Sequence, residues 1–225
     1  MTNLIQTLIS GLSLGSIYAL IALGYTMVYG IAKMLNFAHG DVIMVGAYSG
    51  IVAVAQLGLS PWVTVIVSIA VCAVLGVAIE FCAYKPLRQA APLSVLITAI
   101  GVSYLLQNAA LLLFGSQQMA YPKLLKLPIL TVGGVQIDGI TLLTLAVTAA
   151  LMAALTLFID RTKLGKAMRA VSEDKDAATL MGINVDRTIT LTFAIGSALA
   201  AFASMFYGMT YVYIKPTTGA MPGIK

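Results

Sequence analysis

The sequence predicts an all-α fold, a polytopic bundle of transmembrane helices with about six spans. Composition is the first observation: 60% of the 225 residues are hydrophobic and 9% are charged, with a mean hydropathy of +0.98, whereas soluble proteins carry about 25% charged residues. The second is that the charges cluster and leave uncharged runs, each long enough for a helix of about 20 residues across a bilayer. The runs cover residues 1–32, 42–79, 89–122, 139–159 and 188–214. We expect residues 1–225 to form a single transmembrane domain.

Each span follows from one of these runs. The first run has no basic residue before Lys33, which predicts a retained helix rather than a cleaved signal peptide. The second run is long enough for two helices and breaks at Leu57-Gly58-Leu59-Ser60-Pro61. The other runs hold one span each. The predicted spans lie near residues 5–29, 42–57, 61–80, 92–114, 139–159 and 188–213.

Small residues within the spans predict close contacts between helices. They are Gly11-x-x-x-Gly15 in the first span, Gly46-x-x-x-Gly50 in the second, and Gly196, Ala200 and Ala203 in the sixth. Missing side chains let backbones approach, so the pattern indicates a tight bundle and is compatible with a dimer. Cys72 and Cys82 have no metal-ligand spacing and are interpreted as small, buried hydrophobic residues.

Basic residues set the predicted orientation. Loop 160–187 carries six Lys and Arg residues, against two in loop 115–138 on the other side of the fifth span. Since cytoplasmic loops are enriched in Lys and Arg, loop 160–187 is predicted to be cytoplasmic and the N-terminus external. The net charge of +5 comes from such loops without interleaved aromatic residues, which argues against nucleic-acid binding. In outer loop 115–139, alternation around Gly133-Gly134 predicts a small β-hairpin.

Polar side chains gather between the first two spans, at the predicted inner membrane boundary. They are Lys33, Asn36, His39 and Asp41. One interpretation is a proton relay through His39 and Asp41, since ionisable groups at membrane depth usually serve a purpose. The interpretation we favour is structural: Asp41 accepts backbone N–H bonds near a helix N-terminus, while Asn36 and His39 satisfy irregular backbone. One His with no Cys nearby argues against a metal site.

The loop between the fifth and sixth spans is the most charged part of the chain. Eleven of the 21 charged residues lie between Asp160 and Thr188. The pattern predicts a helix stopped by Gly182, because glycine readily takes the left-handed conformation. Small residues at Ala177 and Ala178 leave room for a partner surface to approach. Acidic residues beside them present charge: Glu173, Asp174 and Asp176. We expect another protein to dock on this segment.

Three motifs together carry a family resemblance that runs essentially end to end. They are Gly24-Tyr-Thr-Met-Val-Tyr-Gly30, Asn36-Phe-Ala-His-Gly-Asp41, and Gly165-Lys-Ala-Met-Arg-Ala170 with Asp174 and Ala177-Ala178-x-x-x-Gly182-Ile183-Asn184. In these motifs the chain resembles the H-type permeases of branched-chain amino acid ABC transporters, and it is similar to urea permeases of the same superfamily. Asp176-Ala-Ala-x-x-x-Gly182 resembles the EAA-x-x-x-G loop of ABC importer permeases, with Asp replacing the first Glu.

The resemblance implies a subunit of a bacterial inner-membrane importer for leucine, isoleucine or valine. Its partners would be a second, related permease, two ATPase subunits, and a periplasmic binding protein that delivers the amino acid. Because the chain has no Gly-x-x-x-x-Gly-Lys-Ser/Thr loop, ATP and Mg would be used by the partners, and this chain is expected to bind no cofactor. Family members continue beyond Lys225, so we expect a chain truncated at its C-terminus.

The resemblance also implies roles for individual residues, none of them catalytic. Coupling to the ATPase falls on Gly165, Arg169, Ala170, Glu173, Asp174, Asp176, Ala177, Ala178 and Gly182. A moderately polar path, or a structural motif, is expected at Asn36, Phe37, His39, Gly40, Asp41, Gln107 and Asn108. The alternative for the amides is interhelical hydrogen bonding.

Two other classes of protein remain as rivals. An ion-gradient-driven carrier would need a carboxylate within the membrane, or broken helices in two repeats. Glu80 and Asp138 fall at span edges, and no acidic residue is predicted at mid-membrane. A membrane-bound enzyme is the weaker rival, because the single His has no plausible nucleophile beside it and the loops are short.

Overall fold

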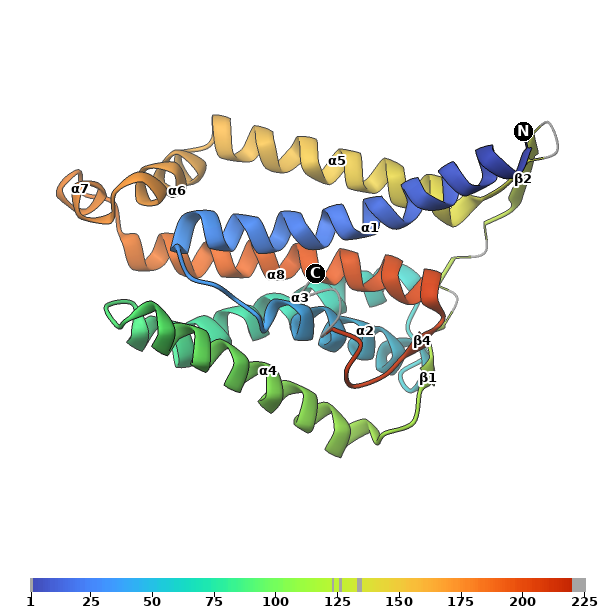
Figure 1. Cartoon of the computed structure of the whole chain (residues 1–225), viewed down its shortest axis with the longest axis horizontal. Helices are drawn as coiled ribbons and strands as arrows, with labels where there is room; N and C mark the ends of the chain where they lie inside the picture. The colour runs from blue at the N-terminus through green and yellow to red at the C-terminus, as the bar shows by residue number, and fades with distance from the viewer. Residues whose placement is uncertain (1, 123, 126, 133–134, 220–225) are drawn as a thin grey trace.

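The computed structural model describes residues 2–122, 124–125, 127–132 and 135–219 and is mainly helical (Figure 1). This part of the chain contains eight α-helices, a π-helix, a 3-10 helix and four short strands. In order they are α1 (Thr2–Ala32), α2 (His39–Ala55), α3 (Pro61–Ile79), the π-helix Glu80–Tyr84, the 3-10 helix Lys85–Leu87, α4 (Pro92–Phe114), β1 (Met119–Ala120), β2 (Ile129–Val132), β3 (Val135–Asp138), α5 (Gly139–Arg161), α6 (Lys163–Glu173), α7 (Lys175–Leu180), α8 (Val185–Tyr211) and β4 (Tyr213–Ile214).

Five of these helices are long and apolar enough to cross a membrane, which confirms the polytopic all-α bundle. They are α1, α4, α5, α8 and α3 with its short continuation to Leu87. Proline at the first position starts α3 and α4, where its missing N–H has no partner to lose. The second predicted span differs, because α2 has 17 residues and reaches only about 26 Å.

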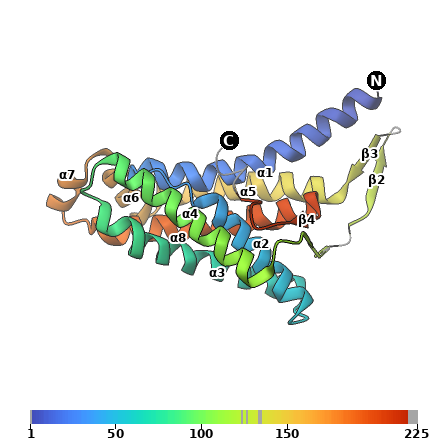
Figure 2. The same ribbon diagram turned by 60° about the horizontal axis from the view of Figure 1, so that its bottom comes forward.

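Helix α8 forms the centre of the bundle. Of the residues in its most apolar 18-residue stretch, 67% are buried, compared with 11% in the corresponding stretch of α5. It packs against α1, α2 and α3, while α5 lies on α1 and α4 lies on α2. In Figures 1 and 2 the helices run side by side, with α6 and α7 at one end and the N-terminus and β2–β3 at the other. We call these the α7 end and the hairpin end.

Glycines allow α1 and α3 to approach α8 closely. A Cβ built on Gly24 would lie 2.9 Å from the Gly196 carbonyl oxygen. A Cβ on Gly76 would lie 2.6 Å from the Cβ of Ser197. The predicted small stripe of Gly196, Ala200 and Ala203 is buried, as expected for a helix contact. A side chain at either position would therefore force the helices apart.

The other predicted glycine motifs behave differently from each other. Gly46 meets Ser204 and Cys72, so it forms a helix contact, whereas Gly50 makes room for the Tyr121 ring from the loop after α4. A Cβ on Gly11 or Gly15 would meet nothing within 4 Å among the described residues. Of the two cysteines predicted to be buried, Cys72 is buried and Cys82 is exposed.

Helix α2 begins inside the bundle rather than at its end. After α1, Lys33 takes the left-handed conformation with φ of 58°, and the non-helical segment that follows runs back along the bundle (Figure 1). His39, at the start of α2, lies against Gly24, about 12 Å before the end of α1. The placement of His39 and Asp41 at the inner membrane boundary stays a prediction, and the structure shows that both side chains are buried inside the bundle. Non-helical backbone is tolerated at this depth because protein surrounds it.

The predicted hairpin in loop 115–139 is confirmed. Strands β2 and β3 pair antiparallel, with Ile129 opposite Asp138, and the predicted turn residues Gly133-Gly134 lie outside the described residues. A second pairing was not predicted: β1 pairs antiparallel with β4, so that Met119 faces Ile214. This pairing ties the loop after α4 to the segment that follows α8.

Candidate functional site

The charged segment forms two helices joined by side-chain caps. Thr162 ends α5 and caps α6, its hydroxyl accepting from the Gly165 amide at 2.9 Å. A Cβ on Gly165 would lie 2.5 Å from the Phe158 carbonyl oxygen, so only glycine fits this turn. Helix α6 then buries one face, with Met168 and Val171 inside the core. Thus α6 lies folded back on the end of α5.

Helix α7 is held at both ends. Asp174 caps its start, its carboxylate accepting from the amides of Asp176 at 2.8 Å and Ala177 at 3.0 Å. Gly182 ends it with φ of 80°, and the Ile183 amide donates to the Ala178 carbonyl at 3.0 Å. This is the glycine-terminated helix end predicted from the sequence. Asn184 then caps α8, accepting from the Arg187 amide at 2.9 Å.

The tip of α7 exposes an apolar pair. Leu180 is 88% and Met181 is 81% exposed, and both lie directly before the rigid turn at Gly182. Glu173, Asp174 and Asp176 are exposed beside them. Apolar side chains that project from a charged surface are typical of a protein contact. We call Leu180, Met181 and these three acidic residues the α7 tip.

Two residues expected to face a partner instead pack within this chain. Ala178 is 3% exposed and belongs to the core, and Gly165 is buried against α5. Their small size lets α7 and α6 approach their own bundle. Ala177 and Arg169 are exposed and Ala170 is half-buried, and Arg169 pairs with Asp160 on α5. Within this segment, only the exposed residues are accessible to another protein.

Lys175 fastens α7 to α1. Its ammonium donates to the Ala32 carbonyl at 2.9 Å, one of the carbonyls left free at the end of a helix. Burial lowers the pKa of Lys175, and the nearby positive charges of Arg88 and Lys33 lower it further. Three basic side chains thus gather where α1, α7 and the end of α3 meet.

A buried ion cluster near the α7 end was missed by the sequence reasoning. Glu80, fully buried, pairs with Arg88, which also pairs with Asp186 at the start of α8. Thr190 donates to the second Glu80 oxygen at 2.8 Å, and Lys85 lies 3.3 Å from Asp186. The cluster spans the π-helix, a rare element that often marks functional sites. The available signal was a lone Glu followed eight residues later by Arg.

A second cluster lies inside the bundle, around Asp41. Gln107 of α4 donates to Asp41 Oδ1 at 3.0 Å and to the Ser103 hydroxyl at 3.1 Å. Asp41 is in the first turn of α2, as predicted, but it accepts from a side chain on α4 and not from the backbone amides expected. Its other oxygen has no hydrogen-bond partner among the described residues.

The remaining predicted path residues divide between this cluster and other places. The Tyr84 hydroxyl donates to Asn36 Oδ1 at 3.0 Å, which anchors the non-helical segment to the π-helix. His39 is buried against Tyr25 in an edge-on ring contact with centroids 6.2 Å apart. Phe37 is half-buried, and Gly40 is buried in the first turn of α2. Asn108 is exposed and bonds to Tyr104 of its own helix, so it lies apart from the cluster.

These positions change one argument made from the sequence. An acidic residue, Asp41, lies well inside the bundle, which the sequence reasoning did not anticipate. His39 and Asp41 make no ion pair with each other, and within the described residues no group of three His, Cys, Asp or Glu side chains could hold a metal ion.

Comparison with known proteins gives a consistent result. Residues 7–225 match the family described as the permease component of branched-chain amino acid transport systems. The chain is 45% identical to the high-affinity branched-chain amino acid transport system permease protein BraD of Pseudomonas aeruginosa, over 98% of this chain and 76% of that protein. It is 42% identical to LivH of Escherichia coli K12, with the same coverage. The protein named as probable branched-chain amino acid transport permease protein LivH in Methanocaldococcus jannaschii is 29% identical, over 84% of this chain and 61% of that protein. No solved structure matches the chain.

Proposed function

We propose, from the fact that this chain belongs to the permease-component family of branched-chain amino acid transport systems, that it forms part of the membrane path of an ATP-driven importer. The substrates would be leucine, isoleucine and valine, which a periplasmic binding protein delivers. A second, related permease and two ATPase subunits would complete the assembly. ATP and Mg would be bound by the ATPases, so that this chain contributes transport and no catalytic group.

The observation that carries the proposal is the α7 tip. A short helix is fixed at both ends by Asp174 and Gly182 and exposes Leu180 and Met181. Such a projection suits docking in a pocket of an ATPase, because the backbone is already fixed at both ends and loses little entropy on binding. Movement of the ATPases would then displace α7 and rock the bundle between its outward and inward states.

The orientation follows from the same segment. The α7 end holds most of the basic residues of loop 160–187, and basic loops remain in the cytoplasm. We therefore propose that the α7 end is cytoplasmic, that the hairpin end and the N-terminus are periplasmic, and that the bilayer is the bacterial inner membrane. The ATPases are then on the side where ATP is present.

The test is recovery of the ATPase with variants of the α7 tip. We expect L180S/M181S to reach the membrane at normal levels but to lose the co-purifying ATPase and vanadate-sensitive leucine uptake. Leu57, 63% exposed at the hairpin end, supplies the matched control: L57S should retain both. Equal ATPase recovery with L180S/M181S and L57S would contradict the docking role.

A second candidate, an ion-gradient-driven carrier, gains support from one observation, the interior carboxylate of Asp41. Its uptake would resist vanadate and collapse with a protonophore. A permease for urea or short amides is the further alternative, and competition by unlabelled urea against leucine distinguishes it.

A further inference from the structure

Asp41 is an acidic side chain inside the bundle, and among the described residues it has no cationic partner. It is 1% exposed, and its ties are to Gln107 and Ser103, both uncharged. Among the described residues it makes no salt bridge, and Oδ2 has no partner. Burying an unpaired charge is costly, so an ionisable group inside a membrane bundle is by default a candidate functional group that binds a partner. The missing partner of a carboxylate is a cation.

Asp41 does not itself line a groove, but it lies one helical turn before Val45, the first residue of α2 that lines an apolar groove. Asp41, Val45 and Tyr48 share one face of α2, by their helical spacing. Helix α4 is attached to this face at two points: Gln107 bonds to Asp41 at 3.0 Å, and Phe114 stacks on Tyr48 with ring centroids 4.3 Å apart. Both pairs are seven residues apart on their helices, a separation of about 10 Å.

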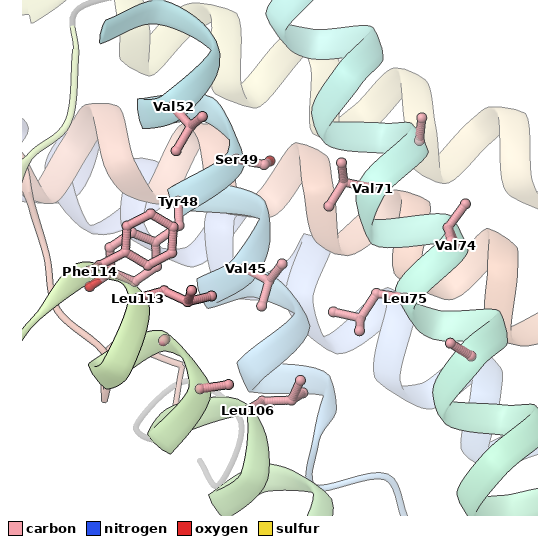
Figure 3. A pocket seen from close by; sticks show the side chains of 14 residues that line it. Val45, Tyr48, Ser49, Val52, Val71, Val74, Leu75, Leu106, Leu113 and Phe114 are labelled. Atoms are coloured by element: carbon pink, nitrogen blue, oxygen red, sulfur yellow. The ribbon is translucent and has the colours of Figure 1, made fainter. Parts of the chain in front are cut away.

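Between the two attachments the walls are aliphatic. Val45 of α2, Leu75 of α3 and Leu106 of α4 face a common space of about 730 Å³ (Figure 3). Its lining is apolar apart from the Ser49 and Tyr48 hydroxyls. A ligand that fits this arrangement carries a positive charge at one end and a branched hydrocarbon at the other.

We propose that Asp41 binds the α-ammonium group of an aliphatic amino acid in transit, while the hydrocarbon side chain lies along Val45 and Leu106. The inference rests on the proposed transport function and adds the binding group. An ammonium donates charge-assisted hydrogen bonds to Oδ2, while Gln107 holds Oδ1 and so fixes the carboxylate plane. Urea has neither the charge nor the hydrocarbon, so the same site selects amino acids against small amides.

The experiment measures leucine uptake by the complete transport complex, reconstituted with its binding protein. Asp41→Asn keeps an oxygen for the Gln107 amide and removes the charge, so it tests the charge alone. We expect assembly with the partner subunits at wild-type levels and an uptake rate at least tenfold lower. Thr156→Val is the control, since it removes an exposed hydroxyl that bonds only to the Met152 carbonyl of its own helix, and it should transport normally.

A second variant separates recognition of charge from damage to the fold. In D41N/Q107E the carboxylate moves across to α4, about 3 Å away, and the hydrogen-bonded pair is retained. Recovery of uptake to at least tenfold above D41N supports ammonium binding. Wild-type uptake by D41N, or no recovery in an assembled D41N/Q107E complex, overturns it while leaving vanadate-sensitive transport intact. If wild-type uptake instead resists vanadate and follows the proton gradient, the importer proposal falls and Asp41 serves a coupling cation.

Discussion

The contact between Gly76 and Ser197 offers a sharp test of how the bundle is held together. In Gly76→Ala the new Cβ would lie 2.6 Å from the Ser197 Cβ and 3.0 Å from the Phe193 carbonyl oxygen. Carbon atoms in good contact are about 3.5–4.0 Å apart, so α3 and α8 must separate by about 1 Å. Overpacking of this kind costs about 1–3 kcal/mol of unfolding free energy. Alanine also stabilises a helix relative to glycine by about 0.5–1 kcal/mol.

Gly101 supplies the matched control, because a Cβ there meets nothing within 4 Å among the described residues. Gly101→Ala measures the change in unfolding free energy that comes from helix propensity alone. Subtracting it from the change in Gly76→Ala leaves the packing term, the cost of overpacking, of about 1–3 kcal/mol. Equilibrium unfolding of the purified protein in mixed detergent micelles, followed by far-UV circular dichroism, provides both values.

A compensating change tests the mechanism directly. Ser197→Gly removes the Cβ and the hydroxyl that the new alanine meets, so G76A/S197G should recover most of the packing term. The expected coupling between the two sites is at least about 1 kcal/mol, as for residues in direct contact. The reasoning fails if G76A unfolds like G101A, or if the two substitutions are additive.

Three further predictions concern the α7 end. Arg88→Leu leaves Glu80 buried without its cation and should lower the unfolding free energy by about 3–5 kcal/mol, whereas E80Q/R88L should recover much of it; equal losses in detergent unfolding would contradict the ion cluster. Gly182→Ala places a Cβ at a positive φ and should cost about 1 kcal/mol, seen as faster hydrogen exchange of the Ile183 amide; unchanged exchange would rule out the strained turn. Lys175 has a lowered pKa in the folded state, so the unfolded state binds more protons and the wild type should gain stability over K175M as the pH rises towards about 10.4. If the difference in melting temperature between the two proteins stays constant across this pH range, the pKa of Lys175 is not lowered in the folded state.

The sequence predicts much of this fold, because a lipid-spanning helix must be long and uncharged. The predicted spans 92–114 and 139–159 coincide with α4 and α5 to within two residues. Residues 33–38 show the limit of this reasoning. Apolar pattern marks where helices can form, but the route of a non-helical segment depends on tertiary contacts such as Asn36 with Tyr84. Sequence alone therefore placed Asp41 at the boundary.

The candidate sites show the same division. Gly182 acts through local backbone geometry, so residue type predicted the C-terminal end of α7 correctly, whereas the break at Asp174 between α6 and α7 was not predicted. The burial of Ala178 and the pairing of Glu80 with Arg88 depend on which face meets the bundle. Inside a membrane protein that face is poorly marked by hydrophobicity, because lipid and core are both apolar. The Asp41 to Gln107 bond joins residues 66 positions apart and has no local signature.

The bond from Lys175 to the Ala32 carbonyl places the surface helix and the interior acid on one short mechanical linkage. From Ala32 the chain needs only nine residues to reach Asp41, and Asn36 within that stretch is held by the Tyr84 hydroxyl. Under the proposed function, a displacement of α7 would therefore reach the last turn of α1 first and then, through this short segment, the start of α2, where Asp41 contacts α4.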